Sequence, residues 1–164
     1  MRGYYSNSPP LPYCEVIVLS DYQHILIAAD FSSHHQQVFD KAIDVAASNQ
    51  AKLSLCHIVE DYPITDFAYE PMISVDIDMR EELLKSAKKT MASMAKTLAI
   101  PTENQWIEFG NPRHDIVRLA QEHDVDLIVV GSHGRHGIKL LLGSTANAVL
   151  HHAQCDVLAV RLSE

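Results

Sequence analysis

The chain has 164 residues, of which 47% are hydrophobic and 21% charged, and its formal net charge is -8. This length suits one domain, which buries roughly 70% of the surface that the unfolded chain exposes. No apolar run approaches the ~20 residues that a membrane-spanning helix needs, so we expect no membrane partner. The acidic balance, without any block or stripe of Lys and Arg, also argues against nucleic acid as a partner.

The three cysteines, Cys14, Cys56 and Cys155, are far apart in the chain and form no CxxC pair. Such a pattern is typical of a reducing compartment, so we expect a cytoplasmic protein. Cys56 and Cys155 are interpreted as inert core residues, with redox use as the alternative. Residues 1–21 carry an apolar stretch too short for a signal peptide. We interpret them as a tail that precedes a single domain at residues 22–164.

From residue 24 onward, short apolar runs alternate with helical periodicity. Strands are predicted from nearly continuous apolar runs at residues 24–29, 52–59, 106–109, 126–130 and 156–162. Helices are predicted after the Ser32-Ser33 turn, at residues 79–99, from Pro112 onward and at residues 140–152. Residues 61–78 are predicted to form a long crossover loop. Strict alternation of this kind implies parallel strands joined by right-handed crossovers, with helices on both faces of the sheet.

Two helix starts carry capping residues. A hydroxyl of Ser32 or Ser33 is placed to accept hydrogen bonds from the free amides of the first helix. Asn111 is placed to cap the third helix, and Pro112 supplies the backbone angle favoured at the first helical position. Both patterns predict where the chain turns from a strand into a helix.

The segment after the fourth predicted strand has the ingredients of a phosphate cradle. It reads GSHGRHG at residues 131–137 and continues to Gly143-Ser144-Thr145, where a helical pattern is under way. Glycines permit positive φ and close approach to a ligand, successive amides form a nest, and hydroxyls at a helix start attract phosphate. The segment is not a P-loop, because no Lys follows the last glycine, and it is not the dinucleotide fingerprint, which follows a first strand. The alternative interpretation is a tight turn without a ligand.

The segment GSHGRHGIKLLLGSTANAVLHHAQCDVLAVR resembles the carboxyl-terminal signature of the universal stress protein A family. HILIAADFS, AKLSLCHIVED and DVDLIVVGSHG resemble its other landmarks in the same order, and the likeness covers about residues 23–162. The resemblance implies an open, Rossmann-like parallel sheet of order 3-2-1-4-5 whose crevice lies between the ends of the first and fourth strands. It also implies a homodimer through the last strand, Asp156 to Leu162, and in many members ATP at the crevice. An uncovered apolar edge at residues 157–160 favours the same pairing.

Carried over by position, the resemblance implies a nucleotide site with three parts. Ala28 and Asp30 are expected beside the adenine or ribose, and the backbone of Ile58 is expected to meet the adenine. The ribose and phosphates are expected to be lined by Gly131, His133 and Gly134, and the phosphate chain to be held by Gly143, Ser144 and Thr145. Asp30 is also a candidate ligand for the Mg²⁺ that accompanies ATP, or else an acid that favours the start of the next helix.

Two features of the sequence depart from the ATP-binding pattern. The eight residues between Gly134 and Gly143 are one fewer than ATP-binding members usually have. One residue corresponds to up to about 3.5 Å of reach, which is comparable to the spacing of adjacent phosphates. The first half of the chain also resembles a branch of the family that does not bind ATP.

The chain has ten histidines, but their spacing does not predict a metal site. His34-His35 and His151-His152 are adjacent pairs expected to diverge on a helix, and no set has tetrahedral ligand spacing. His133 could donate to phosphate, or it is a solvated loop residue. Three functions therefore remain: a nucleotide-responsive stress or signalling dimer, a dimeric interaction protein without a nucleotide, and a weak ATPase. No residue is identified that would orient water for catalysis.

Overall fold

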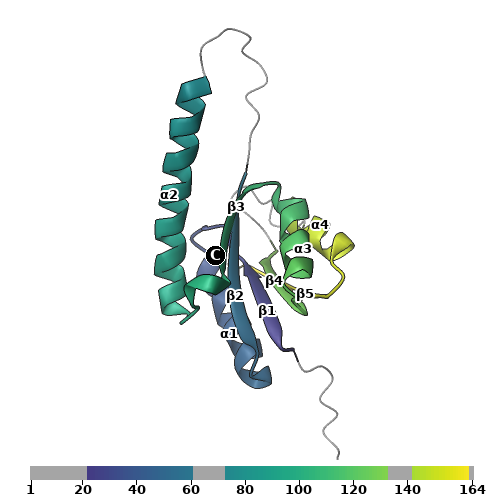
Figure 1. The fold of residues 1–164 in the computed structure, drawn as a ribbon. Coiled ribbons are helices and arrows are strands. Elements are labelled where there is room, and N and C mark those ends of the chain that lie inside the picture. The colour runs from purple at the N-terminus through teal and green to yellow at the C-terminus, as the bar shows by residue number, and fades with distance from the viewer. Residues whose placement is uncertain (1–21, 61–72, 133–141, 163–164) are drawn as a thin grey trace, which may run out of the picture.

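The structure is a computed structural model that describes residues 22–60, 73–132 and 142–162 of the chain. Strands and helices alternate along this part of the chain (Figure 1). In chain order they are β1 (His24–Ala28), α1 (His35–Asn49), β2 (Lys52–Glu60), α2 (Ile73–Thr97), β3 (Gln105–Gly110), α3 (Pro112–Glu122), β4 (Leu127–Gly131), α4 (Ser144–His152) and β5 (Asp156–Val160). A short 3₁₀ turn, Thr102–Asn104, precedes β3.

The five strands form one parallel sheet in the order β3-β2-β1-β4-β5. β1 lies at the centre, where Ala28 is the register partner of Cys56 on β2 and of Val130 on β4. The predicted parallel sheet and its order are therefore confirmed. Because β2 and β3 extend the sheet on one side of β1 while β4 and β5 extend it on the other, the winding reverses between β1 and β4.

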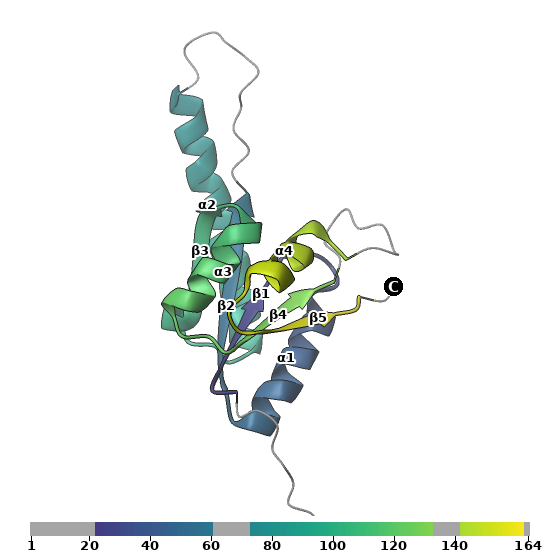
Figure 2. The ribbon, with the colours of Figure 1, turned by 90° about the vertical axis from the view of Figure 1, so that its right-hand side faces the viewer.

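Helices cover both faces of the sheet (Figures 1 and 2). On one face, Ile25 and Ile27 of β1 pack in a core with residues of α1 and α2, among them Phe39 and Met91. On the other face, Leu26 packs with α3 and with Val149 of α4. The alternation of Ile25, Leu26 and Ile27 between two cores explains the continuous apolar run of β1, since a strand buried on both faces has no polar side.

Three predicted boundaries were wrong. α2 begins at Ile73, so residues 73–78 are helical and not part of a loop; neither Pro nor Gly occurs between Pro71 and Pro101, and helix propagation adds one hydrogen bond per residue. α4 begins at Ser144 and not at residue 140, since Gly143 is its extended N-cap, a position that glycine favours over the helix interior. β5 ends at Val160, two residues before Leu162.

Of the two predicted caps, one is confirmed in full. The Asn111 side chain accepts a hydrogen bond from the Arg113 amide at 3.0 Å, and Pro112 opens α3. At α1 the N-cap residue is His34, which has no side-chain capping bond; the Ser32 hydroxyl instead accepts from the His34 amide at 3.3 Å. Among the described helices, none combines the length and the apolar character required to cross a membrane.

Candidate functional site

The candidate site lies where β1 and β4 end side by side. Ala28 ends β1 opposite Val130, and Gly131, the last residue of β4, is the next residue along that strand. The carboxyl ends of parallel strands at a reversal of winding form the usual ligand crevice of open α/β sheets. The structure thus brings Ala28 and Gly131 together from opposite halves of the chain.

The start of α4 is held at the same edge by backbone hydrogen bonds. The Gly143 amide donates to the Ser132 carbonyl at 2.7 Å, and the Ser132 amide donates to the Val160 carbonyl at 2.8 Å. Ser132 is buried, Ser144 is exposed, and Thr145 is half-buried. The residue that follows β4 and the residue that precedes α4 are therefore bonded to each other at this edge of the sheet. His133 and Gly134, which were predicted to line the ribose and phosphates, lie outside the described residues.

Gly143 presents a different chemistry from the one expected. Its amide is bonded within the protein, so what it can offer a ligand is close approach to the backbone, because it has no side chain. It also provides no side-chain cap, and no other side chain caps α4 in the described part of the chain. The first amides of a helix carry a partial positive charge when they lack acceptors, which favours an anion beside Ser144 and Thr145.

The expectation of positive φ was wrong at the two described glycines of this segment. Neither Gly131 nor Gly143 has positive φ, whereas Phe31 does, with φ of 54°. A bulky residue in this region is strained, and such strain collects at functional sites. Phe31 directly follows Asp30 at the end of β1, so the strained residue lies at the edge of the candidate site.

Phe31 stacks on His57, with ring centroids 3.7 Å apart and ring planes 16° apart. His57 Nδ1 lies 2.7 Å from the Ala29 carbonyl; since a carbonyl only accepts, this nitrogen carries the proton. Sequence reasoning placed His57 on a strand but did not connect it with Phe31. Its one signal was the side-chain alternation of the strand, which puts His57 on the same face as Leu55.

Asp30 and Ile58 flank this pair. One carboxylate oxygen of Asp30 accepts from the Ser32 amide at 2.9 Å, which forms a tight turn after β1. Ile58 is buried against α3 on the opposite face of the sheet from Leu55, and its register partner is Glu108 on β3. Because β2 continues to Glu60, beyond Cys56, Ile58 lies past the point where β1 has ended. The Ile58 backbone therefore lies at the edge of the sheet where the crevice is expected.

Comparison with known proteins identifies the family to which this architecture belongs. The sequence model described as the universal stress protein family matches residues 21–161. Universal stress protein A homolog 1 of Coxiella burnetii is 42% identical over 143 residues, which cover 87% of this chain and 99% of the relative. The chain belongs to the universal stress protein family.

Two solved structures show how closely this universal stress protein follows the family fold. UspA from Lactobacillus plantarum superimposes with a TM-score of 0.72 at 28% identity, covering 87% of this chain and 99% of the other. A universal stress protein solved in complex with cAMP superimposes with a TM-score of 0.55 at 28% identity, covering 88% of this chain and all of the other at 100%.

The described cysteines of this universal stress protein are not activated. Complete burial raises the pKa of the Cys56 thiol to about 12, with a further contribution from the charge of Glu108. Burial, followed by the charges of Asp126 and Asp156, also raises the pKa of Cys155. A thiol with a raised pKa holds little thiolate at neutral pH, which fits the inert core interpretation over redox use. Within residues 22–60, 73–132 and 142–162, no group of three or more His, Cys, Asp or Glu side chains could hold a metal ion.

Proposed function

We propose that this universal stress protein binds an adenine nucleotide across the carboxyl ends of β1 and β4. The observation that carries the proposal is the convergence of Ala28, Gly131 and the uncapped start of α4 at one reversal of the sheet. A helix start without a capping side chain suits a phosphate group, because the amides and the helix dipole both favour negative charge. The related universal stress protein in complex with cAMP supports an adenine nucleotide as the ligand class.

Each proposed contact has a chemical reason. Ser144 and Thr145 offer hydroxyl donors beside the first amides of α4, where the phosphate chain is proposed to lie. Gly131, with Gly134 and His133, is proposed to line the ribose and phosphates, and Gly143 to allow close approach. Ala28 and the Ile58 backbone are proposed to border the adenine. Asp30 has the carboxylate that Mg²⁺ prefers as a ligand, so it is the proposed link to a metal that accompanies ATP.

The experiment is calorimetric titration with ATP and with cAMP, each with and without Mg²⁺. A Gly143→Val variant is expected to weaken binding at least tenfold, because the added side chain occupies the space a phosphate approaches. Valine suits the backbone here, since Gly143 has φ of -58° and ψ of 153°, so folding should be unchanged by circular dichroism. A Gly143→Ala variant, which adds one methyl group, is the matched control and should weaken binding less.

The alternative is a dimer of the same fold that binds no nucleotide, and one observation favours it. The Gly143 amide is bonded to Ser132, so one donor of the proposed cradle is already used inside the protein. Absence of heat and of any thermal shift at millimolar ATP would decide for this alternative. Weak ATPase activity would require phosphate release above a protein-free control that the Gly143→Val variant abolishes.

The proposed partner is a second copy of the chain, paired through β5. β5 lies at the edge of the sheet, with Val157, Leu158 and Ala159 half-buried. The Asp156 amide donates to the Asp126 carbonyl and the Val160 carbonyl accepts from Ser132, so residues 156 and 160 direct their backbone groups toward β4. Because a strand alternates, the amide of Ala159 is directed outward, toward a partner edge.

An Ala159→Pro variant removes this outward amide and leaves the bonds to β4 in place. It is expected to shift the protein to monomer in light scattering, whereas the control variant Ala159→Ser keeps the amide and should stay dimeric. Wild-type protein that scatters only as monomer at high concentration would remove the dimer from the proposal.

A further inference from the structure

A second polar hollow lies between α3 and α4 and shares Ser144 with the candidate site. It is an open groove of about 640 Å³ lined by Arg113, His114, Ser144, Asn147, Ala148, His151 and His152. The five α4 residues recur three and four positions apart, which places them along one helical face. The two α3 residues belong to its first turn. His151 and His152, the last two residues of α4, both line this groove.

The charge of the groove is opposite to that of the whole protein. The lining contains one guanidinium and three imidazoles but no carboxylate, although the chain as a whole carries a net charge of -8. Neighbouring acids on α3 are engaged elsewhere. Arg118 forms ion pairs with Glu108, Asp115 and Glu122, and these contacts, led by its hydrogen bond to Glu122, raise the pKa of Arg118.

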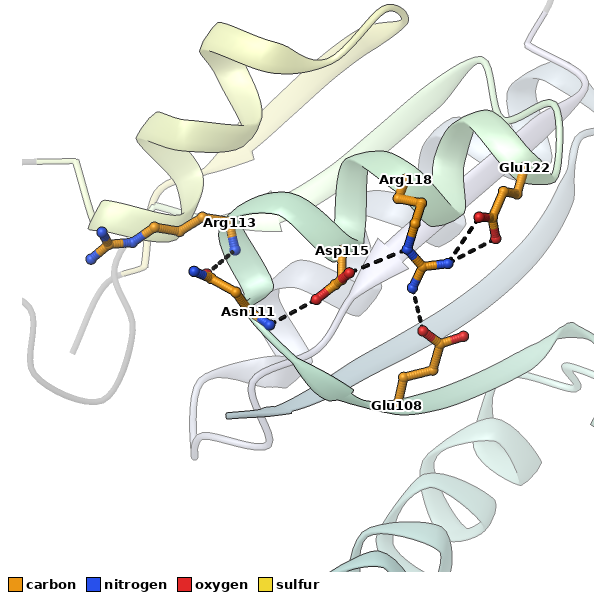
Figure 3. A network of polar contacts seen from close by, with 6 residues as sticks. All are labelled: Glu108, Asn111, Arg113, Asp115, Arg118 and Glu122. Carbon is orange, nitrogen blue, oxygen red and sulfur yellow. Dashed lines mark hydrogen bonds and ion pairs between the residues drawn. The ribbon is translucent and has the colours of Figure 1, made fainter. Parts of the chain in front are cut away.

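Arg113 is not part of that network. Figure 3 shows its side chain extending away from Arg118 and its three carboxylates, while the Arg113 backbone amide donates to Asn111. No ion pair of the Arg113 guanidinium occurs among the described residues. An arginine positioned in this way has its planar set of donors available to phosphate oxygens, which it binds in bidentate fashion.

The other lining groups are suitable donors as well. The rings of His114 on α3 and His152 on α4 lie 6.3 Å apart between centroids, with their planes tilted by 40°, so both helices contribute an imidazole to the groove. The Ser144 hydroxyl and the Asn147 amide add neutral donors on the α4 side. The volume falls in the range of small-molecule sites, and it exceeds what a single ion would fill.

We propose that the α3–α4 groove binds a small molecule that carries more than one phosphate group. Arg113 binds one phosphate, His114 and His152 donate to the same anion from both sides, and Asn147 sets its position along α4. This site does not rest on the proposed nucleotide crevice, although Ser144 borders both. The ligand class follows from the donors, because several fixed donors without a carboxylate match a polyanion.

The test uses inorganic triphosphate as the probe, titrated calorimetrically into the intact protein. The Arg113→Gln and His152→Gln variants are each expected to weaken binding about tenfold, the loss of one charge-assisted contact. Lys41→Gln is the matched control, because it removes the same charge from α1 on the opposite face of the sheet. In amide NMR spectra, the probe should shift the signals of Asn147 and Ala148.

Several results would overturn the inference. They are absence of triphosphate binding at millimolar concentration, equal weakening by Lys41→Gln, or shifts confined to residues far from α3 and α4. Equal weakening would mean that the probe responds to net charge alone. Failure of this site is distinguishable from failure of the nucleotide crevice. Cyclic AMP carries a single phosphate, so its binding should respond to Gly143→Val and not to Arg113→Gln.

Discussion

Replacing Gly110 with alanine is expected to destabilise the fold through a side chain of the next element. A Cβ atom at Gly110 would lie 2.1 Å from Oδ2 of Asp115, so Asp115 must move. That oxygen accepts a hydrogen bond from the Asn111 amide at 2.7 Å, and the other carboxylate oxygen pairs with Arg118 at 3.2 Å (Figure 3). The effect is steric, since Gly110 does not have positive φ.

The sign of the change in the free energy of unfolding distinguishes Gly110 from an ordinary glycine in a strand. Where the backbone is compatible, Gly→Ala stabilises a protein by about 0.4–1 kcal/mol by restricting the unfolded chain. Here the loss of a hydrogen bond to a charged group costs about 1.5–3 kcal/mol. The ion pair with the half-exposed Arg118 is left out because solvent screens it. The net cost is about 1–2 kcal/mol, which lowers Tm by about 2–8 °C.

The assay is thermal and urea unfolding of four proteins: wild type, Gly110→Ala, Asp115→Ala and the double variant. Without the Asp115 carboxylate there is nothing for the new methyl group to displace, so Gly110→Ala should be neutral or slightly stabilising in that background. The two substitutions should therefore be strongly coupled in a double-mutant cycle. Equal destabilisation in both backgrounds, or none in wild type, would refute the steric argument.

Two further predictions concern buried titratable groups. Burial, followed by the charge of Lys52, lowers the pKa of His24 below 6.5, against the opposing effects of the His123 carbonyl and Asp126. The unfolded chain therefore binds more protons just below pH 6.5, and the free energy of unfolding should fall as the pH drops through that window. A His24→Gln variant should flatten this part of the urea-unfolding profile, and an unchanged slope would contradict the assignment. Because burial raises the pKa of Cys56 to about 12, its thiol should resist iodoacetamide at pH 8 in the folded protein and react in urea. Mass spectrometry of the Cys56 peptide measures the extent of labelling. Rapid labelling of the folded protein would contradict this prediction.

Most of the strands could be predicted because the central strands pack against a hydrophobic core on each face of the sheet and are therefore apolar on both sides. Ile25, Leu26 and Ile27 leave no polar face, and that alone predicts a central strand of a sheet covered on both sides. Caps were readable where the chemistry is local, as at Asn111. They were less so at the start of α1, where His34 takes the N-cap position and the Ser32 hydroxyl accepts from the amide of that cap residue.

The elements that border the candidate site could be predicted from the sequence, but the contacts made there could not. Strand alternation and the glycine-hydroxyl step indicated the carboxyl edge and the start of α4. They did not indicate that the Gly143 amide is bonded to Ser132, or that Phe31 takes the positive φ expected of a glycine. Such features depend on which backbone groups meet after the sheet has formed.

Arg113 and Arg118 show most plainly where sequence reasoning ends. They lie five positions apart on one short helix. Asp115 and Glu122 lie three and four positions from Arg118 and are local partners of it, but no local pattern indicates Glu108 as a third partner. Packing of α3 against β3 brings Glu108 to Arg118, while packing against α4 leaves Arg113 among histidines. The order of apolar and polar residues therefore specifies which elements form and where a ligand edge lies. Only the assembled sheet and helices specify which charge meets which, because those contacts join residues that the chain keeps far apart.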